Sequence, residues 1–301
     1  MATIKAHRSF TVNDVKKSGK TLAHFIEDQL RDHPRKTLTV VTFDTETTGI
    51  DADAEITQCS FTIQTIRDKG VAARDCRPGR SVRAARRKDV WEYDEPINID
   101  RFYRPSRHES WAEASKVTGI YPHRTDKSAL VIKDEDGNVT EVKRDLKSFD
   151  DPECIAEVQS IIDSADIICG HNVGFDISRI ERWGVTVPSL TTIVDTMYDY
   201  KDYRSTIALR DEMFRKNLTE AAGFFGYKFT AHNSMNDVGA TCYLFNNMFK
   251  QDALTANSKK FTVNRYNKAC QRAERWAATR AANLAAERAA NLAAERAADA
   301  A

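Results

Sequence analysis

The chain has 301 residues, with 45 lysines and arginines against 44 aspartates and glutamates, 41% hydrophobic residues and 30% charged residues. This balance is typical of a soluble globular protein, because it excludes wholesale disorder and any global field that would attract nucleic acid or a membrane surface. The first ten residues lack an apolar signal core, and no run of about 18 apolar residues occurs, so secretion and membrane spanning are not expected. The six cysteines are far apart without a C-x-x-C pair. We therefore expect reduced thiols and a cytoplasmic protein.

The first predicted elements are a helix and three strands. Residues 1–36 form an N-terminal extension, in which apolar residues at helical spacing predict a short helix near residues 20–31 (Leu22, Phe25, Ile26 and Leu30). The β-branched, apolar run at 37–43 predicts a buried strand. Residues 55–66 alternate apolar and polar side chains, which predicts a strand with one covered face, and a third strand is expected at 97–103.

Two insertions interrupt this pattern, near residues 74–89 and 124–148. The first has seven basic residues against two acidic ones, and its composition fits either a solvated surface loop or a contact with nucleic acid. The second contains a predicted hairpin over residues 130–142 that turns at Asp136-Gly137.

Helices and short strands alternate in the next part of the chain. Asp151 followed by Pro152 is typical of a helix start, with the aspartate as the cap. A short strand is expected at residues 166–169, and helices at 175–183, 218–225 and 234–249. The order predicts an α/β (α+β) domain over residues 37–250, built on a mixed sheet.

Residues 251–301 differ in kind and form a predicted tail. Five basic residues and two aromatic residues occur between positions 259 and 272 without an acid, a pattern that fits nucleic-acid binding and an ordinary solvated helix face equally. The octapeptide RAANLAAE at 280–287 repeats at 288–295. Because a period of eight does not match a helical turn, the favoured interpretation is a frayed, low-complexity helix, with partner docking as the alternative.

Three short segments carry the residues whose pattern points to a chemical function. In TVVTFDTETTG, at 39–49, strand alternation places Asp44 and Glu46 on one side, where two carboxylates need a positive partner. In IICGHNVGFD, at 167–176, a strand leads through a turn to Asp176, which is either a helix cap or a ligand.

The third segment is AHNSMNDVGATCYLFNNMF, at 231–249. His232 and Asp237 are five residues apart and cannot share a helical face. They can converge if His232 lies in the loop and Asn233 or Ser234 caps a helix that carries Asp237 in its first turns.

Together, FDTETTG, HNxxFD and His-x4-Asp resemble the DEDDh 3′–5′ exonucleases, a family that includes the proofreading subunit of bacterial replicative polymerases. WAEASKVTGI (111–120) and IVDT (193–196) are similar to further segments of that family. The resemblance covers about residues 37–250 and implies a ribonuclease H-like mixed sheet flanked by helices. It implies these catalytic residues: Asp44, Glu46, Asp176, His232 and Asp237.

The resemblance also implies a metal-dependent chemistry. Four converging acids would repel a phosphodiester, so two divalent cations are expected on Asp44, Glu46, Asp176 and Asp237. Hard oxygen ligands select Mg²⁺ or Mn²⁺. His232 is the expected general base, since an imidazole accepts a proton near neutral pH.

Four residues are expected to meet the terminal nucleotide by resemblance: Thr45, Thr47, Asn172 and Phe175. For Phe175, core packing is an equal alternative.

The expected function is hydrolysis at nucleic-acid 3′ ends that releases 5′-mononucleotides, on single-stranded or frayed DNA, as in proofreading or end trimming. RNA trimming is the alternative with the same chemistry, since no residue can be assigned to recognition of the 2′-hydroxyl. A catalytically silent nucleic-acid-binding module and an adaptor for a separate DNA polymerase are the alternatives from other classes.

Overall fold

The computed structural model describes Ile26, Leu30 and residues 37–51, 53–68, 91–106, 111–188, 191–207 and 217–250. The basic insertion at 74–89, the tail at 251–301 and most of the N-terminal extension lie outside these described residues. Ile26 and Leu30 are helical and buried in the core, in agreement with the helix predicted near residues 20–31.

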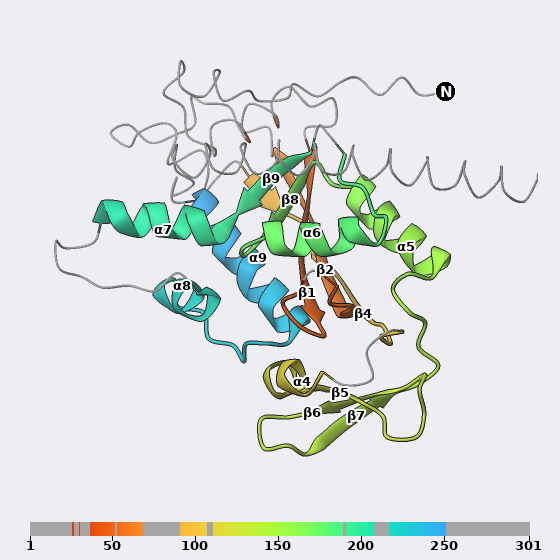
Figure 1. Ribbon diagram of the computed structural model, residues 1–301. Helices are drawn as coiled ribbons and strands as arrows, with labels where there is room; N and C mark the ends of the chain where they lie inside the picture. Colours follow the sequence, from red (N-terminus) through yellow and green to blue (C-terminus); the bar gives the residue numbers. More distant parts are fainter. Residues whose placement is uncertain are drawn as a thin grey trace, which may run out of the picture.

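The strands and helices follow one another along the chain as shown in Figure 1. The strands are β1 (Thr37–Thr47), β2 (Ile56–Asp68), β3 (Trp91–Tyr93), β4 (Ile97–Phe102), β5 (Ile120–Pro122), β6 (Leu130–Lys133), β7 (Val139–Lys143), β8 (Ile167–Gly170) and β9 (Thr192–Asp195). The helices are α4 (Ala112–Thr118), α5 (Pro152–Asp163), α6 (Gly174–Arg182), α7 (Thr196–Ile207), α8 (Leu218–Phe224) and α9 (Ser234–Lys250).

The main sheet is mixed, with the order β3-β2-β1-β8-β9 and β4 paired with β2. Strand β2 is antiparallel to β1, whereas β8 and β9 run parallel to β1. Helices cover both faces of the sheet (Figure 1). This arrangement confirms the expected mixed sheet flanked by helices.

Two hydrophobic clusters lie on opposite faces of this sheet. Leu38 and Val40 of β1 pack with residues of α9, while Val41 and Phe43 pack with residues of α5 and α6. The alternation follows from the pleat of a strand, in which successive side chains point to opposite faces. Strand β1 therefore has an α9 face and an α6 face, and each can present its own polar groups.

The second insertion forms a small sheet of its own, in the order β5-β6-β7. The predicted hairpin is confirmed, with Gly137 in its turn at a φ of 83°. The hairpin gains a third strand, β5, because Ile120 and Leu130 pack with Trp111 in a small apolar cluster. This cluster also contacts Phe102 of β4.

Several predicted elements are confirmed, with changed bounds. Strand β1 was expected to end at residue 43, but pairing with β2 extends it to Thr47, so that both acids lie within the strand. The third strand expected from the sequence, at 97–103, corresponds to β4. It is the fourth strand in the structure because the short β3 precedes it. Asp151 caps α5 by accepting the Glu153 N–H at 2.9 Å. Within the described ranges, no helix combines the length and apolar character needed to cross a bilayer.

Candidate metal centre and active site

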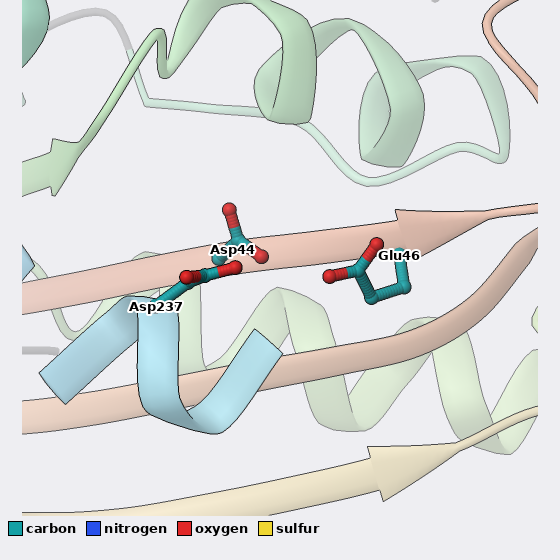
Figure 2. Close-up of side chains that lie close together, drawn as sticks. All are labelled: Asp44, Glu46 and Asp237. Carbon is teal, nitrogen blue, oxygen red and sulfur yellow. The ribbon is translucent and has the colours of Figure 1, made fainter. Parts of the chain in front are cut away.

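Three carboxylates meet where β1 approaches the first turn of α9. Asp44 and Glu46 follow Leu38 and Val40 on the α9 face of the strand, as the period of two requires. Figure 2 shows these two side chains along β1 and Asp237 on α9. Each residue offers one carboxylate oxygen, and the three oxygens lie within 4.8 Å of one another. We call Asp44, Glu46 and Asp237 the carboxylate cluster.

The start of α9 is fixed directly onto β1. The Ser234 hydroxyl donates to the carbonyl oxygen of Asp44 at 2.7 Å. Asn233 caps the helix, because its Oδ1 accepts the Asn236 N–H at 3.2 Å and its carbonyl accepts the Asp237 N–H at 2.9 Å. The cap was predicted from the sequence, whereas the contact of Ser234 with a strand 190 residues away was not.

Asp176 approaches β1 from the other face. It lies in the first turn of α6, and its Oδ1 accepts both the N–H of Thr45, at 3.0 Å, and the Thr45 hydroxyl, at 2.7 Å. The N-cap position of α6 belongs to Val173, so Asp176 is not the cap of this helix. The structure therefore places Asp176 beside the carboxylate cluster, with one oxygen already bonded to the protein.

These acids lie in surroundings that disfavour their charged forms. Burial, followed by the charges of Asp176, Glu46 and Asp237, raises the pKa of Asp44 well above its usual value. Burial and the charges of Asp237 and Asp176 raise the pKa of Glu46 to about 8. Burial also raises the pKa of Asp176 and of Asp237 to about 7, although hydrogen bonds from Thr45 and His232 act in the opposite direction. A bound cation would favour ionisation of all four.

The position of His232 fits the loop expected from the sequence. Its backbone is left-handed, with a φ of 66°, and its N–H donates to Asp237 Oδ2 at 3.1 Å. The side chain is exposed. The backbone of His232 thus fixes a member of the carboxylate cluster, and the imidazole lies at the solvent side of the same loop.

The four residues expected to meet a nucleotide have the following contacts. The Thr45 hydroxyl donates to Asp176, and the Thr47 hydroxyl donates to the Gly49 carbonyl at 2.6 Å. Asn172 has a φ of 67°, and its N–H donates to Asp195 Oδ1 at 2.9 Å. The half-buried Phe175 ring lies 4.4 Å from the Arg179 guanidinium.

Sequence reasoning missed Arg179, Asp195 and Thr196, which organise the backbone around these acids. Arg179 is buried and donates to the Ile50 carbonyl at 2.6 Å and to that of Asp51, so it holds the loop that follows β1 against α6. Asp195 and Thr196 contact the turn between β8 and α6. No local spacing signals these long-range contacts. Only the IVDT segment indicated this place in the chain, where Asp195 ends β9 and Thr196 begins α7.

No protein-family model and no curated protein matches the chain. Among solved structures it is similar to E. coli exonuclease I in complex with a dA16 oligonucleotide, at 17% identity and a TM-score of 0.45, covering 72% of this chain and 42% of that one. It is also similar to a 3′-exonuclease that recognises the histone mRNA stem-loop, at 10% identity and a TM-score of 0.42, covering 72% of this chain and 84% of that one. The chain thus spans less than half of exonuclease I. Likenesses this distant do not assign an activity, which has to be argued from the site.

Proposed function

We propose that the protein is a metal-dependent nuclease. Within that class, we propose a 3′–5′ exonuclease of the DEDDh type, which hydrolyses phosphodiester bonds at 3′ ends and releases 5′-mononucleotides. The observation that supports this most directly is the carboxylate cluster, formed by residues about 190 positions apart, with its oxygens within 4.8 Å. The 3′–5′ direction of hydrolysis is proposed from the resemblance of the three motifs to the DEDDh exonucleases.

The residues of the carboxylate cluster fit a divalent cation. Their donors are hard carboxylate oxygens without a cysteine or imidazole among them, which suits Mg²⁺ or Mn²⁺. Within the described ranges, no ion pair joins these carboxylates to a basic side chain, so no cationic side chain there offsets their mutual repulsion. When bound, two such ions supply an activated water and charge stabilisation of the phosphate. Asp44, Glu46, Asp237 and Asp176 would hold them.

The residues around the cluster have distinct proposed roles. Thr45 holds one oxygen of Asp176, which orients the other carboxylate oxygen. His232 presents an exposed imidazole on the loop beside Asp237, where it accepts the proton of the attacking water. Asn172 and Phe175, with the backbone around Thr45 and the side chain of Thr47, contact the terminal nucleotide.

For the substrate we propose single-stranded or frayed DNA 3′ ends, in proofreading or end trimming. The support for DNA is the resemblance of FDTETTG and HNxxFD to proofreading exonucleases. A separate DNA polymerase is proposed as a partner on the same resemblance. A cytoplasmic location is proposed because the six cysteines are far apart and form no C-x-x-C pair. RNA trimming is the competing proposal, and a matched pair of oligonucleotides decides between them.

The test uses 5′-labelled and 3′-labelled DNA and RNA oligonucleotides of one sequence, with Mg²⁺ or with a chelator. We expect a 5′-labelled ladder that shortens stepwise from the 3′ end, 5′-mononucleotide products, and no cleavage with the chelator. Asp44→Ala should abolish cleavage, whereas Asp136→Asn, in the exposed hairpin turn, should not change it. Internal fragments, chelator-resistant cleavage, or strand binding without cleavage would each contradict the proposal.

A further inference from the structure

The end of β9 and the start of α7 contact the chain from Gly170 to Asn172, which leads from β8 into α6. Asp195 Oδ1 accepts the Asn172 N–H at 2.9 Å. The Thr196 hydroxyl donates to the Gly170 carbonyl at 3.1 Å and lies 3.0 Å from Nδ1 of His171. Asp195 is 1% exposed and Thr196 is fully buried. We call Asp195 and Thr196 the strand-end pair.

The direction of these hydrogen bonds follows from counting protons. A threonine hydroxyl has one proton, and that of Thr196 goes to the Gly170 carbonyl. The short contact with His171 therefore requires Nδ1–H to donate to the Thr196 oxygen. The strand-end pair thus fixes the turn through two backbone contacts and one side-chain contact.

The same turn leads directly into the first turn of α6. The Phe175 N–H donates to the Asn172 carbonyl at 2.8 Å, and the Ile177 N–H donates to the Val173 carbonyl at 2.9 Å. Asn172 has a φ of 67°, a left-handed conformation that asparagine adopts more readily than most residues with a side chain, and the contact with Asp195 holds its N–H in place. Asp176 lies between these two bonded residues, so its position depends on that turn.

One oxygen of Asp195 anchors two elements at once. The Oδ1 atom that accepts the Asn172 N–H also accepts the Met197 N–H, at 3.2 Å, in the first turn of α7. The turn before α6 is therefore tied to the start of α7, and it cannot shift without loss of a buried hydrogen bond. What the geometry requires of Asp195 is an acceptor atom at Oδ1.

We infer that the strand-end pair is a positioning element for Asp176. Through the turn at 170–172 it sets where the Asp176 carboxylate stands relative to the carboxylate cluster, and hence how tightly the site binds a divalent cation. This inference rests on the proposed metal site. Neither residue is placed against a substrate; both act through the turn that carries Asn172 and leads to Asp176.

The test compares two matched pairs of variants. Asp195→Asn and Thr196→Ser keep the acceptor oxygen and the hydroxyl, whereas Asp195→Ala and Thr196→Val remove them. Mn²⁺ affinity and melting temperature are measured on the full chain without nucleic acid, the affinity by calorimetry. The kinetic constants kcat and KM are measured with a single-stranded oligonucleotide as substrate. We expect Asp195→Ala and Thr196→Val to weaken Mn²⁺ binding by roughly 10–100-fold and to lower kcat more than KM changes. The conservative variants should stay within about threefold, since they keep the hydrogen bonds that place Asp176.

The outcomes separate this inference from the proposed function. Wild-type Mn²⁺ affinity in Asp195→Ala and Thr196→Val would overturn the inference, even if their melting temperatures fell, because the role would then be structural only. If Asp195→Ala does not fold, the inference is tested by comparing the Mn²⁺ affinity of Thr196→Val with that of Thr196→Ser. A wild-type protein that binds Mn²⁺ but cuts no strand end contradicts the proposed function. In that case the inference is still tested, because the Mn²⁺ affinities of the variants can be compared with that of the wild type. A wild-type protein without Mn²⁺ binding overturns both.

Discussion

At the scale of single residues, Glu46 lies where its neutral form is favoured, since burial and the charges of Asp237 and Asp176 raise its pKa to about 8. In the folded state Glu46 therefore keeps a proton that it loses in the unfolded chain, and ionisation at pH 8 costs stability. We expect Glu46→Gln to raise the metal-free free energy of unfolding at pH 8 by about 1–3 kcal/mol, allowing for partial exposure. The change in the free energy of unfolding is measured by urea denaturation of both proteins at pH 8 in the presence of a chelator.

The matched control is Glu135→Gln, in the exposed turn between β6 and β7. It removes the same charge without a neighbouring carboxylate cluster, so its free energy of unfolding should change by less than about 0.5 kcal/mol. Equal effects of the two substitutions would show that the surroundings of Glu46 impose no strain on its charged form.

The exposed side chain of His232 permits a test that separates chemistry from metal binding. Its backbone N–H, rather than its imidazole, donates to Asp237, so His232→Ala keeps the contact within the site. We expect kcat to fall by roughly 10²–10⁴-fold while Mn²⁺ affinity measured by calorimetry changes little. His123→Ala, in the β5–β6 loop, removes a histidine remote in sequence and should leave the rate unchanged. An unchanged rate in His232→Ala would remove the general-base assignment.

At the scale of elements, the first turn of α9 is fixed to β1 by a hydrogen bond. The Ser234 hydroxyl donates to the Asp44 carbonyl and so sets how far Asp237 stands from Asp44 and Glu46. We expect Ser234→Ala to lower the free energy of unfolding by about 1 kcal/mol and to weaken Mn²⁺ binding several-fold. Ser160→Ala, on the exposed side of α5, is the control. Unchanged Mn²⁺ affinity in Ser234→Ala would mean that packing of α9 alone positions Asp237.

The elements that carry the acids were predictable because each shows a local pattern. Alternation in β1 places Asp44 and Glu46 on one face, and the Asn233 cap places Asp237 in a first turn. Helix α7 was missed because TMYDYKDYRSTI has no clear apolar stripe, and two of its charged residues, Asp199 and Arg204, are buried. Strands β3 and β5 have only three residues each, too few to show a period.

The contacts that complete the site were not predictable for a different reason. Asp176 is bonded to Thr45, Asp195 to Asn172, and Arg179 to the loop after β1, each between segments far apart in the sequence. Such contacts depend on which strands become neighbours in the sheet. The family resemblance pointed to Asp176, but only the packing of α6 against the other face of β1 explains why its Oδ1 is taken by Thr45.

At the scale of the whole molecule, the carboxylate cluster couples folding to pH and to metal. The raised pKa values of Glu46, Asp176 and Asp237, about 8, 7 and 7, mean that the folded state binds more protons than the unfolded chain between about pH 4 and pH 8. Stability must therefore fall as pH rises through that window. We expect the metal-free melting temperature to decline from pH 5 to pH 8, provided that these groups dominate the titration.

A divalent cation should cancel this decline, because it binds the ionised carboxylates of the folded state. At one hundred times its dissociation constant it adds about 2.7 kcal/mol, and this gain should grow with pH as protons leave the site. Melting at pH 5, 6.5 and 8, with chelator or with Mg²⁺, measures the effect. The double variant Asp44→Asn, Asp237→Asn should show a flatter metal-free profile and no Mg²⁺ response. A Mg²⁺ gain in the double variant equal to that of the wild type would locate the cation elsewhere, since those residues supply two of the three oxygens that lie within 4.8 Å.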